Sequence, residues 1–125
     1  MKNKDIIENL AKLNSSFINS SDVFLPIKLN FFIQKNKQKL IQCAKEIEDF
    51  KMDLGKKYGE YNEETNGYSI KEEYLDLVAK ELNDLAEIDQ DIKIEKVNIN
   101  ALSDDLKLTF DQMDALMFMI EEKEE

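Results

Sequence analysis

The sequence has 125 residues, a formal net charge of −10 and 42% hydrophobic residues, with one Cys, no His and no Trp. This length fits a single domain with one modest core, and the hydrophobic content excludes wholesale disorder. All 17 basic residues are Lys. The lack of His removes the usual general base and the commonest metal ligand, and the lack of Arg removes the bidentate fork that reads phosphates and base edges.

The N-terminal residues do not have the pattern of a secretion signal. Lys2 and Lys4 are followed by an amphipathic stretch that contains Asp5 and Glu8, and no apolar run has the length needed to span a bilayer. We therefore expect a soluble cytoplasmic protein without a membrane partner. The single Cys43 lies among apolar residues, which favours a buried, inert thiol.

Charge is distributed unevenly along the chain. Residues 1–59 hold 11 Lys and 7 acidic residues, whereas residues 60–125 hold 6 Lys and 20 acidic residues. A strongly acidic surface repels nucleic acid and anionic membranes and attracts basic protein surfaces, although solubility alone also explains acidity. The balance predicts a protein partner and no direct contact with nucleic acid.

The first predicted element is an N-terminal helix within residues 1–20. Its apolar residues recur at helical spacing from Asn3 to Asn19, and capping-prone polar residues follow at 19–22. Such a short link predicts that this helix lies antiparallel along the first half of the next helix.

A long central helix is predicted over residues 26–58, with Pro26 in its first turn. A wide apolar stripe at helical spacing supports it: Leu29, Phe32, Ile33, Leu40, Cys43, Ala44, Ile47, Phe50 and Leu54. The stretch 23–33 also alternates as a strand would, so its start stays open between helix and strand. On nearly the opposite side lie three further apolar residues, which predict contact on a second side, with this chain or a partner: Ile27, Ile41 and Met52.

After Gly59 the chain becomes polar and reaches an Asn66-Gly67 turn, which suggests a small hairpin between Tyr58 or Tyr61 and Tyr68. A third helix is predicted over residues 70–87, because Ser69 and Glu72 form a capping-box pattern before apolar residues at helical spacing.

Residues 91–100 change to a period of two and predict a bulged or twisted strand. A lone strand cannot satisfy its own backbone groups. Its partner is expected near Tyr68–Ile70, near the start of the long helix segment, or in another subunit.

A C-terminal helix is predicted over residues 109–121, where Thr109 and Gln112 repeat the capping-box pattern. Its end is apolar almost all round because of Met117, Phe118 and Met119. Insertion into the core and a Met-rich partner surface both explain this composition. We take the candidate partner-binding residues to be Ile27, Ile41, Met52, Met117, Phe118 and Met119.

Motifs with a defined chemistry are missing from the sequence. It has no phosphate-cradling glycine loop, no nucleophile elbow and no zinc-ligand spacing. The acidic residues Glu87, Asp89, Asp91 and Glu95 lack the central Gly and closing Glu of a calcium loop. We therefore expect no catalytic residues, no metal and no cofactor, and a protein that is not an enzyme.

Several short segments resemble one family. They are Leu25-Pro26-Ile27-Lys28, Lys35-Asn36, Lys57-Tyr58-Gly59-Glu60, Gly67-Tyr68-Ser69-Ile70 and the stretch from Thr109 through Asp114 to Glu121. Together they resemble an uncharacterised family of small proteins encoded by phages and prophages of low-GC Gram-positive bacteria. The resemblance covers roughly residues 20–122. It implies a viral or prophage setting and supplies no catalytic residues.

The predicted fold is α+β and mainly α, with the long central helix in a helical hairpin, a third helix, a minor β element and a C-terminal helix, all in one domain over residues 1–125. The leading hypothesis is a non-enzymatic phage or prophage protein that binds a phage or host protein, in assembly or in modulating a host factor. The alternative is an acidic DNA mimic that inhibits a host nucleic-acid-targeting defence system. A homo-oligomer is compatible with either.

Overall fold

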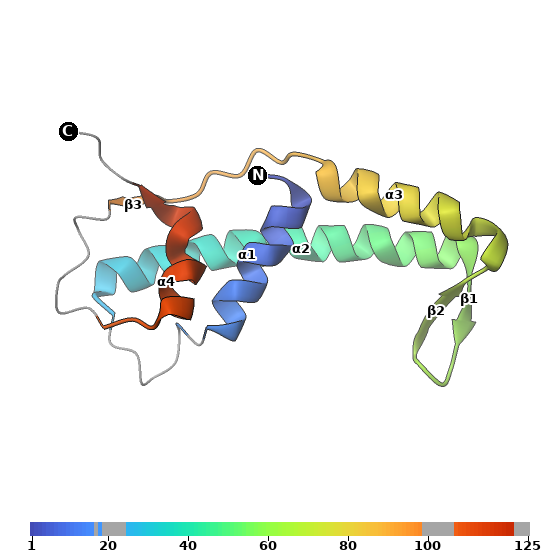
Figure 1. Ribbon diagram of the computed structural model, residues 1–125, viewed down its shortest axis with the longest axis horizontal. Coiled ribbons are helices and arrows are strands. Elements are labelled where there is room, and N and C mark those ends of the chain that lie inside the picture. The colour runs from blue at the N-terminus through green and yellow to red at the C-terminus, as the bar shows by residue number, and fades with distance from the viewer. Residues whose placement is uncertain (17, 19–24, 99–106, 122–125) are drawn as a thin grey trace.

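Helix α2, Ile27–Tyr58, runs the length of the molecule (Figure 1). The computed structural model describes residues 1–16, 18, 25–98 and 107–121. At 1.5 Å per residue, the 32 residues of α2 span about 48 Å. The structure thus confirms the long central helix and makes residues 27–33 helical, while residues 23 and 24 of the competing strand pattern lie outside the described residues.

One face of α2 forms the floor of the core. Its buried residues recur every three or four positions: Leu29, Ile33, Asn36, Leu40, Ile47 and Gly55. They pack with Ile6 and Leu13 from the N-terminal helix and with Leu116 and Met119 near the C-terminus. The main cluster of buried apolar residues therefore lies along α2 from Leu29 to Ile47.

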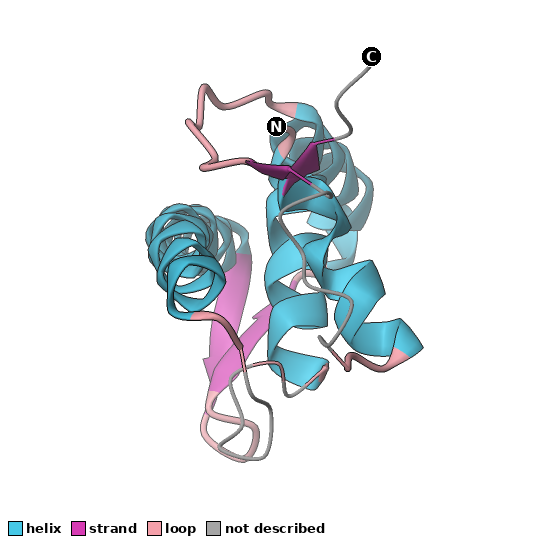
Figure 2. Cartoon of the chain, turned by 90° about the vertical axis from the view of Figure 1, so that its left-hand side faces the viewer, coloured by secondary structure: helices cyan, strands magenta, loops and turns pink. Residues whose placement is uncertain are grey.

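Helix α1, Asn3–Ser15, and helix α4, Phe110–Leu116, cover this part of α2. The chain does not form the predicted hairpin between the first two helices. In Figures 1 and 2, α1 crosses α2 steeply and contacts α4 along its length. This crossing leaves the second half of α2 uncovered by α1.

A β-hairpin follows α2 directly, as the turn signal predicts. Strand β1, Gly59–Asn62, pairs antiparallel with β2, Gly67–Ile70, and Tyr61 lies opposite Tyr68. The turn between them places Asn66 at a φ of 53°, the left-handed region that Asn tolerates better than most residues.

Helix α3, Leu75–Glu87, returns antiparallel along the second half of α2 (Figure 1). It is preceded by a short 3₁₀ helix, η1, Glu72–Tyr74. The predicted third helix therefore starts later than residue 70, because Ser69 and Ile70 belong to β2 and Ser69 caps no helix. The helical hairpin of the fold is α2 with α3, and we call residues 46–88 the arm.

The predicted strand over residues 91–100 is wrong in most of its described length. Residues 91–96 are extended without a ladder, and β3 comprises only Val97–Asn98; residues 99 and 100 lie outside the described residues. Strand β3 pairs in parallel with β4, Ile120–Glu121, a partner that the sequence did not suggest.

The predicted C-terminal helix of residues 109–121 ends early. Helix α4 stops at Leu116, a 3₁₀ helix η3 covers Met117–Met119, and Ile120 and Glu121 are extended. The capping box at Thr109 and Gln112 forms as predicted. The fold is α+β and mainly α, as expected from the sequence.

Candidate interaction surface

The N-terminus fastens the end of α3 to the body of the protein. The α-amino group of Met1 lies 2.7 Å from Oδ1 of Asp89, and Lys2 and Lys4 both reach the carboxylate of Glu87, at 2.7 and 2.8 Å. The buried side chain of Asn3 donates to the carbonyl oxygen of Leu85. These contacts fix where the arm begins to project.

The two lysines change the acidity of Glu87. Hydrogen bonds from Lys2 and Lys4, together with their charge, lower the pKa of this carboxyl from its ordinary value of 4.5 to about 2. Glu87 is thereby fully ionised at neutral pH. An exposed ion pair of this kind contributes little to stability, but three cations at one helix end determine its position.

Buried Asn36 holds the extended segment that follows the arm. Its Nδ2 donates to the carbonyl oxygen of Glu95 at 2.9 Å, and its Oδ1 accepts from the Glu95 amide at 2.8 Å. This pair of bonds imitates one rung of a β-ladder. The Nζ atoms of Lys35 and Lys39 lie 3.7 and 3.8 Å from Oε1 of Glu95.

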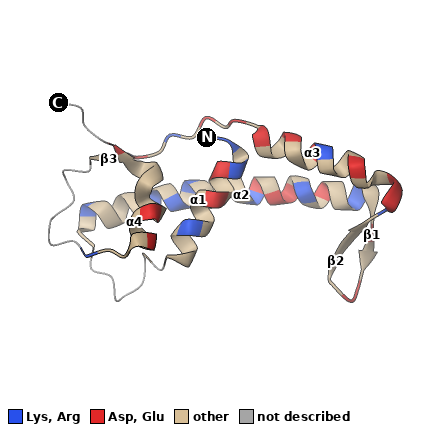
Figure 3. Cartoon of the chain, in the orientation of Figure 1, with Lys and Arg blue, Asp and Glu red and all other residues tan. Residues whose placement is uncertain are grey.

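These contacts explain much of the charge asymmetry along the sequence. Four acids of the second half, Glu87, Asp89, Glu95 and Asp114, pair with cations of the first half. Figure 3 shows acidic and basic residues mixed over α1, acids without any lysine on α4, and mostly acids on α3. The arm, residues 46–88, holds 13 acids and 5 Lys, and of these acids Glu48, Glu60 and Glu87 are in ion pairs, so the surplus of acids is concentrated in the arm.

The arm is only two helices thick, and its apolar residues are incompletely covered. In α3, Val78 is the one buried residue. Large apolar side chains remain exposed on both helices of the arm: Phe50, Met52, Leu75, Leu77, Leu82 and Ile88. Two packed helices cannot bury every side of their apolar stripes, so this surface faces solvent unless another molecule covers it.

An open groove of about 370 Å³ runs along one flank of the arm. Its apolar wall consists of Phe50, Leu54, Leu85 and Ile88, and its rim carries Asp53, Glu81, Asp84 and Lys57. We call these residues the arm groove. An apolar floor with three carboxylates and one ammonium group on the rim fits an apolar ligand with positive charge beside it.

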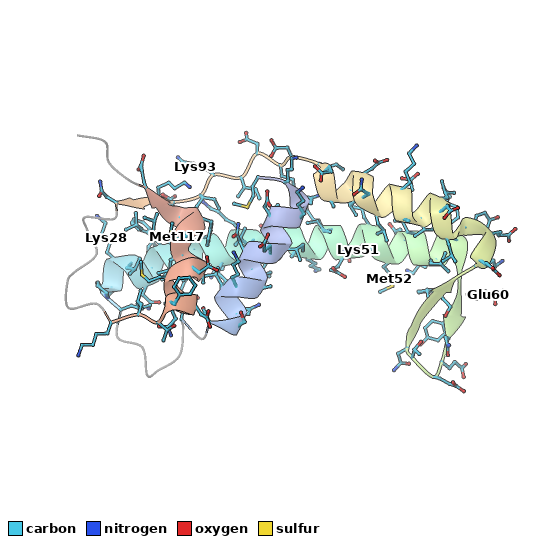
Figure 4. The ribbon with its side chains drawn as sticks, viewed as in Figure 1. Lys28, Lys51, Met52, Glu60, Lys93 and Met117 are labelled. Carbon is cyan, nitrogen blue, oxygen red and sulfur yellow. The ribbon has the colours of Figure 1, made fainter. Side chains whose placement is uncertain are left out.

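The six residues proposed from sequence do not form one surface. Ile27, Ile41, Met52 and Met117 are 88%, 47%, 51% and 58% exposed, Phe118 is half-buried, and Met119 is fully buried. Asn36 donates to the sulfur of Met119 at 3.6 Å, so Met119 is a core residue and not a partner contact. Figure 4 shows Met52 and Met117 at separate places along the molecule.

Sequence reasoning missed the residues of the arm groove. It placed Phe50 and Leu54 on the apolar stripe of the long central helix, which their spacing supports. Helix α1 does not reach the second half of α2 (Figure 1), and Phe50 is 62% exposed there. A signal was present in the surplus of apolar residues on α3, which carries Leu75 and Leu77 on sides that one neighbouring helix cannot cover.

Within the described ranges, no group of three or more Cys, His, Asp or Glu side chains is arranged to hold a metal ion. Among the same residues, no helix is long and apolar enough to cross a membrane. The thiol of Cys43 is half-buried, and burial raises its pKa, with the nearby Glu46 acting in the same direction. A raised pKa makes a thiol less nucleophilic at neutral pH.

Comparison of the chain with known protein families, with curated proteins and with solved structures finds no match.

Proposed function

We propose that this protein is a non-enzymatic, phage- or prophage-encoded protein that binds another protein in the host cytoplasm through the arm groove. The observation that carries the proposal is the apolar wall of the open groove between two helices, in which Phe50 and Ile88 are exposed and Leu54 and Leu85 are half-buried. The viral setting is taken from the resemblance of the sequence segments. The partner is a phage assembly protein or a host factor that the protein modulates.

The groove favours an amphipathic helix as the bound segment. A helix presents apolar side chains at three- and four-residue spacing, which suits an open groove between two parallel walls. The rim residues Asp53, Glu81 and Asp84 select for Lys or Arg beside those apolar anchors, and Lys57 contributes the only positive charge on the rim. We therefore expect a partner helix with two or three apolar anchors and basic flanks.

The acidic DNA mimic is the alternative function. It requires a continuous row of free carboxylates, but five described acids of residues 60–125 are paired with this chain's own cations. The remaining described acids are divided among the β-hairpin, η1, α3, α4 and β4, with Asp91 in the segment after α3 (Figure 3). This distribution favours a protein groove over mimicry of a phosphate backbone.

The test is affinity purification from infected or lysogenic cells with three versions of the protein. Phe50→Glu places a charge in the arm groove at a side chain that is already exposed, and Phe110→Glu does the same outside the arm. We expect one partner to be retained by the wild type and by Phe110→Glu and reduced at least about tenfold by Phe50→Glu, equivalent to about 1.4 kcal/mol.

Equal recovery with both variants would contradict the proposal. So would the absence of any specific partner together with turnover of a small molecule. Retention of a nucleic-acid-binding defence protein by both variants, with an affinity that falls steeply with salt, would favour the alternative.

A further inference from the structure

The side of α2 that faces away from the core is covered by no described element of the chain. The view along the long axis in Figure 2 shows the other helices on one side of α2. Ile27, Phe31, Ile41 and Met52 all lie on the opposite side and are 47–88% exposed. This surface is separate from the arm groove, which opens on the flank of α2 that carries Phe50 and Asp53.

These four residues belong to one regular stripe. Starting at residue 27, steps of four and three alternate through residues 31, 34, 38, 41, 45 and 48 to residue 52. This is the spacing of a heptad seam, in which one helix lies against another of the same length. The apolar members occupy the two ends and the middle, and polar residues such as Gln38 and Lys45 lie between them. We call residues at these positions the outer stripe.

The spacing of the outer stripe is unchanged when the helix direction is reversed. If a second α2 lies antiparallel with residue 27 opposite residue 52, every stripe position meets another stripe position. Ile27 then faces the partner's Met52 at both ends of the contact. Gln38 faces the partner's Ile41, so the two Ile41 side chains lie diagonally across the two-fold axis. The overlap from residue 27 to residue 52 contains 26 residues and, at a rise of 1.5 Å per residue, spans about 38 Å.

Charge distinguishes the antiparallel arrangement from the parallel one. Residues 27–45 of α2 contain five Lys and no acid, whereas Glu46, Glu48, Asp49 and Asp53 all lie in the second half. A parallel pair would place the five-lysine segments side by side. An antiparallel pair places each of them against the half of the other copy that holds all four acids of α2 together with Lys51, Lys56 and Lys57, and it brings Lys28 beside the partner's Asp49.

We infer that the outer stripe is the interface of a two-fold symmetric dimer in which the α2 helices of two copies pack antiparallel. A self-complementary patch of this kind is what a two-fold axis requires. Only four apolar residues per copy contribute, so the dimer is reversible and depends on concentration. It leaves the arm groove of each copy open, and so it does not rest on the function proposed above.

The molar mass in solution, measured by sedimentation from micromolar to millimolar protein, tests the interface. We expect a monomer–dimer equilibrium. Ile41→Glu should raise its dissociation constant at least about tenfold, because each copy then carries a negative charge close to the two-fold axis and the two charges repel. Phe110→Glu, which changes an exposed aromatic residue outside the stripe, should leave the equilibrium unchanged. A monomer at every concentration, or an Ile41→Glu protein that dimerises as the wild type does, would overturn the inference.

The direction of the helices is tested by cross-linking in a Cys43→Ala background. An equal mixture of Ile27→Cys and Met52→Cys proteins should form mixed disulfide dimers faster than either protein alone. Faster cross-linking of Ile27→Cys with itself would overturn the antiparallel arrangement. Lys28→Asp should weaken the dimer, and the further change Asp49→Lys should restore it.

Discussion

Asn36 offers the sharpest test of how residues 91–96 are held against α2. We consider Asn36→Leu, which keeps the approximate volume of the side chain and removes both bonds to the backbone of Glu95. Each buried group left without a partner costs about 1–3 kcal/mol. Glu95 is half-buried, so water reaches part of its backbone and the lower end of that range applies. We therefore expect a loss of about 2–3 kcal/mol in the free energy of unfolding.

Urea denaturation measures this loss, and Asn30→Leu is the matched control because Asn30 lies on the same helix and is exposed. The control should change the free energy of unfolding by less than about 0.5 kcal/mol. The amide of Glu95 should also lose its protection from hydrogen exchange in Asn36→Leu. If Asn36→Leu were as stable as the control, the side chain would not hold the 91–96 segment.

Two further predictions concern the far end of the arm, where α2 meets β1, and the ion pairs at its base. A Cβ at Gly59 would lie 2.7 Å from the carbonyl oxygens of both Gly55 and Ser69, whereas a Cβ at Gly67 meets nothing closer than 3.9 Å. Gly59→Ala should therefore lower the melting temperature through a loss of about 1–3 kcal/mol, and Gly67→Ala should change it little; similar values for both would contradict the packing at this corner. Glu87 has a folded pKa of about 2 against its ordinary value of 4.5, so its stabilising contribution is present above the ordinary value and is lost as the pH falls through the folded one. In denaturation experiments at a series of pH values, the stability difference between wild type and Glu87→Gln should therefore vanish as the pH falls from 4.5 to about 2. A difference that persists below about pH 2 would refute the ion pairs.

The parts of the fold that depend on local signals could be predicted from the sequence. The long apolar stripe of α2 and the reciprocal cap of Thr109 and Gln112 both form. Each needs residues only a few positions apart, so no distant element has to be known. The β-hairpin at Asn66 and Gly67 follows the same rule.

Two local signals led to wrong predictions because contacts with other segments decided the structure. Ser69 and Glu72 have the capping-box spacing, yet Ser69 pairs with Glu60 in the hairpin and caps nothing. The alternating residues 91–96 have a strand pattern, yet their backbone is held by the side chain of Asn36, 59 positions away. No pattern within either segment contains that information.

The candidate surface was only partly predictable for a related reason. Periodicity shows which residues share a helix face, but it does not show whether another element covers that face. Ile27, Ile41 and Met52 were correctly placed opposite the packed side of α2. Met119 was not separable from Met117 by composition, and the turn into η3 sends one into the core and leaves the other exposed.

The central claim, that the arm groove receives a partner protein, is tested most directly by a photo-crosslinking amino acid placed in the groove in living host cells. The probe replaces Phe50 in one protein and Glu63, at the tip of the β-hairpin, in a control. We predict a covalent adduct with one protein from position 50 and none from position 63. Adducts of equal yield from both positions, or an adduct from position 63 alone, would contradict the account.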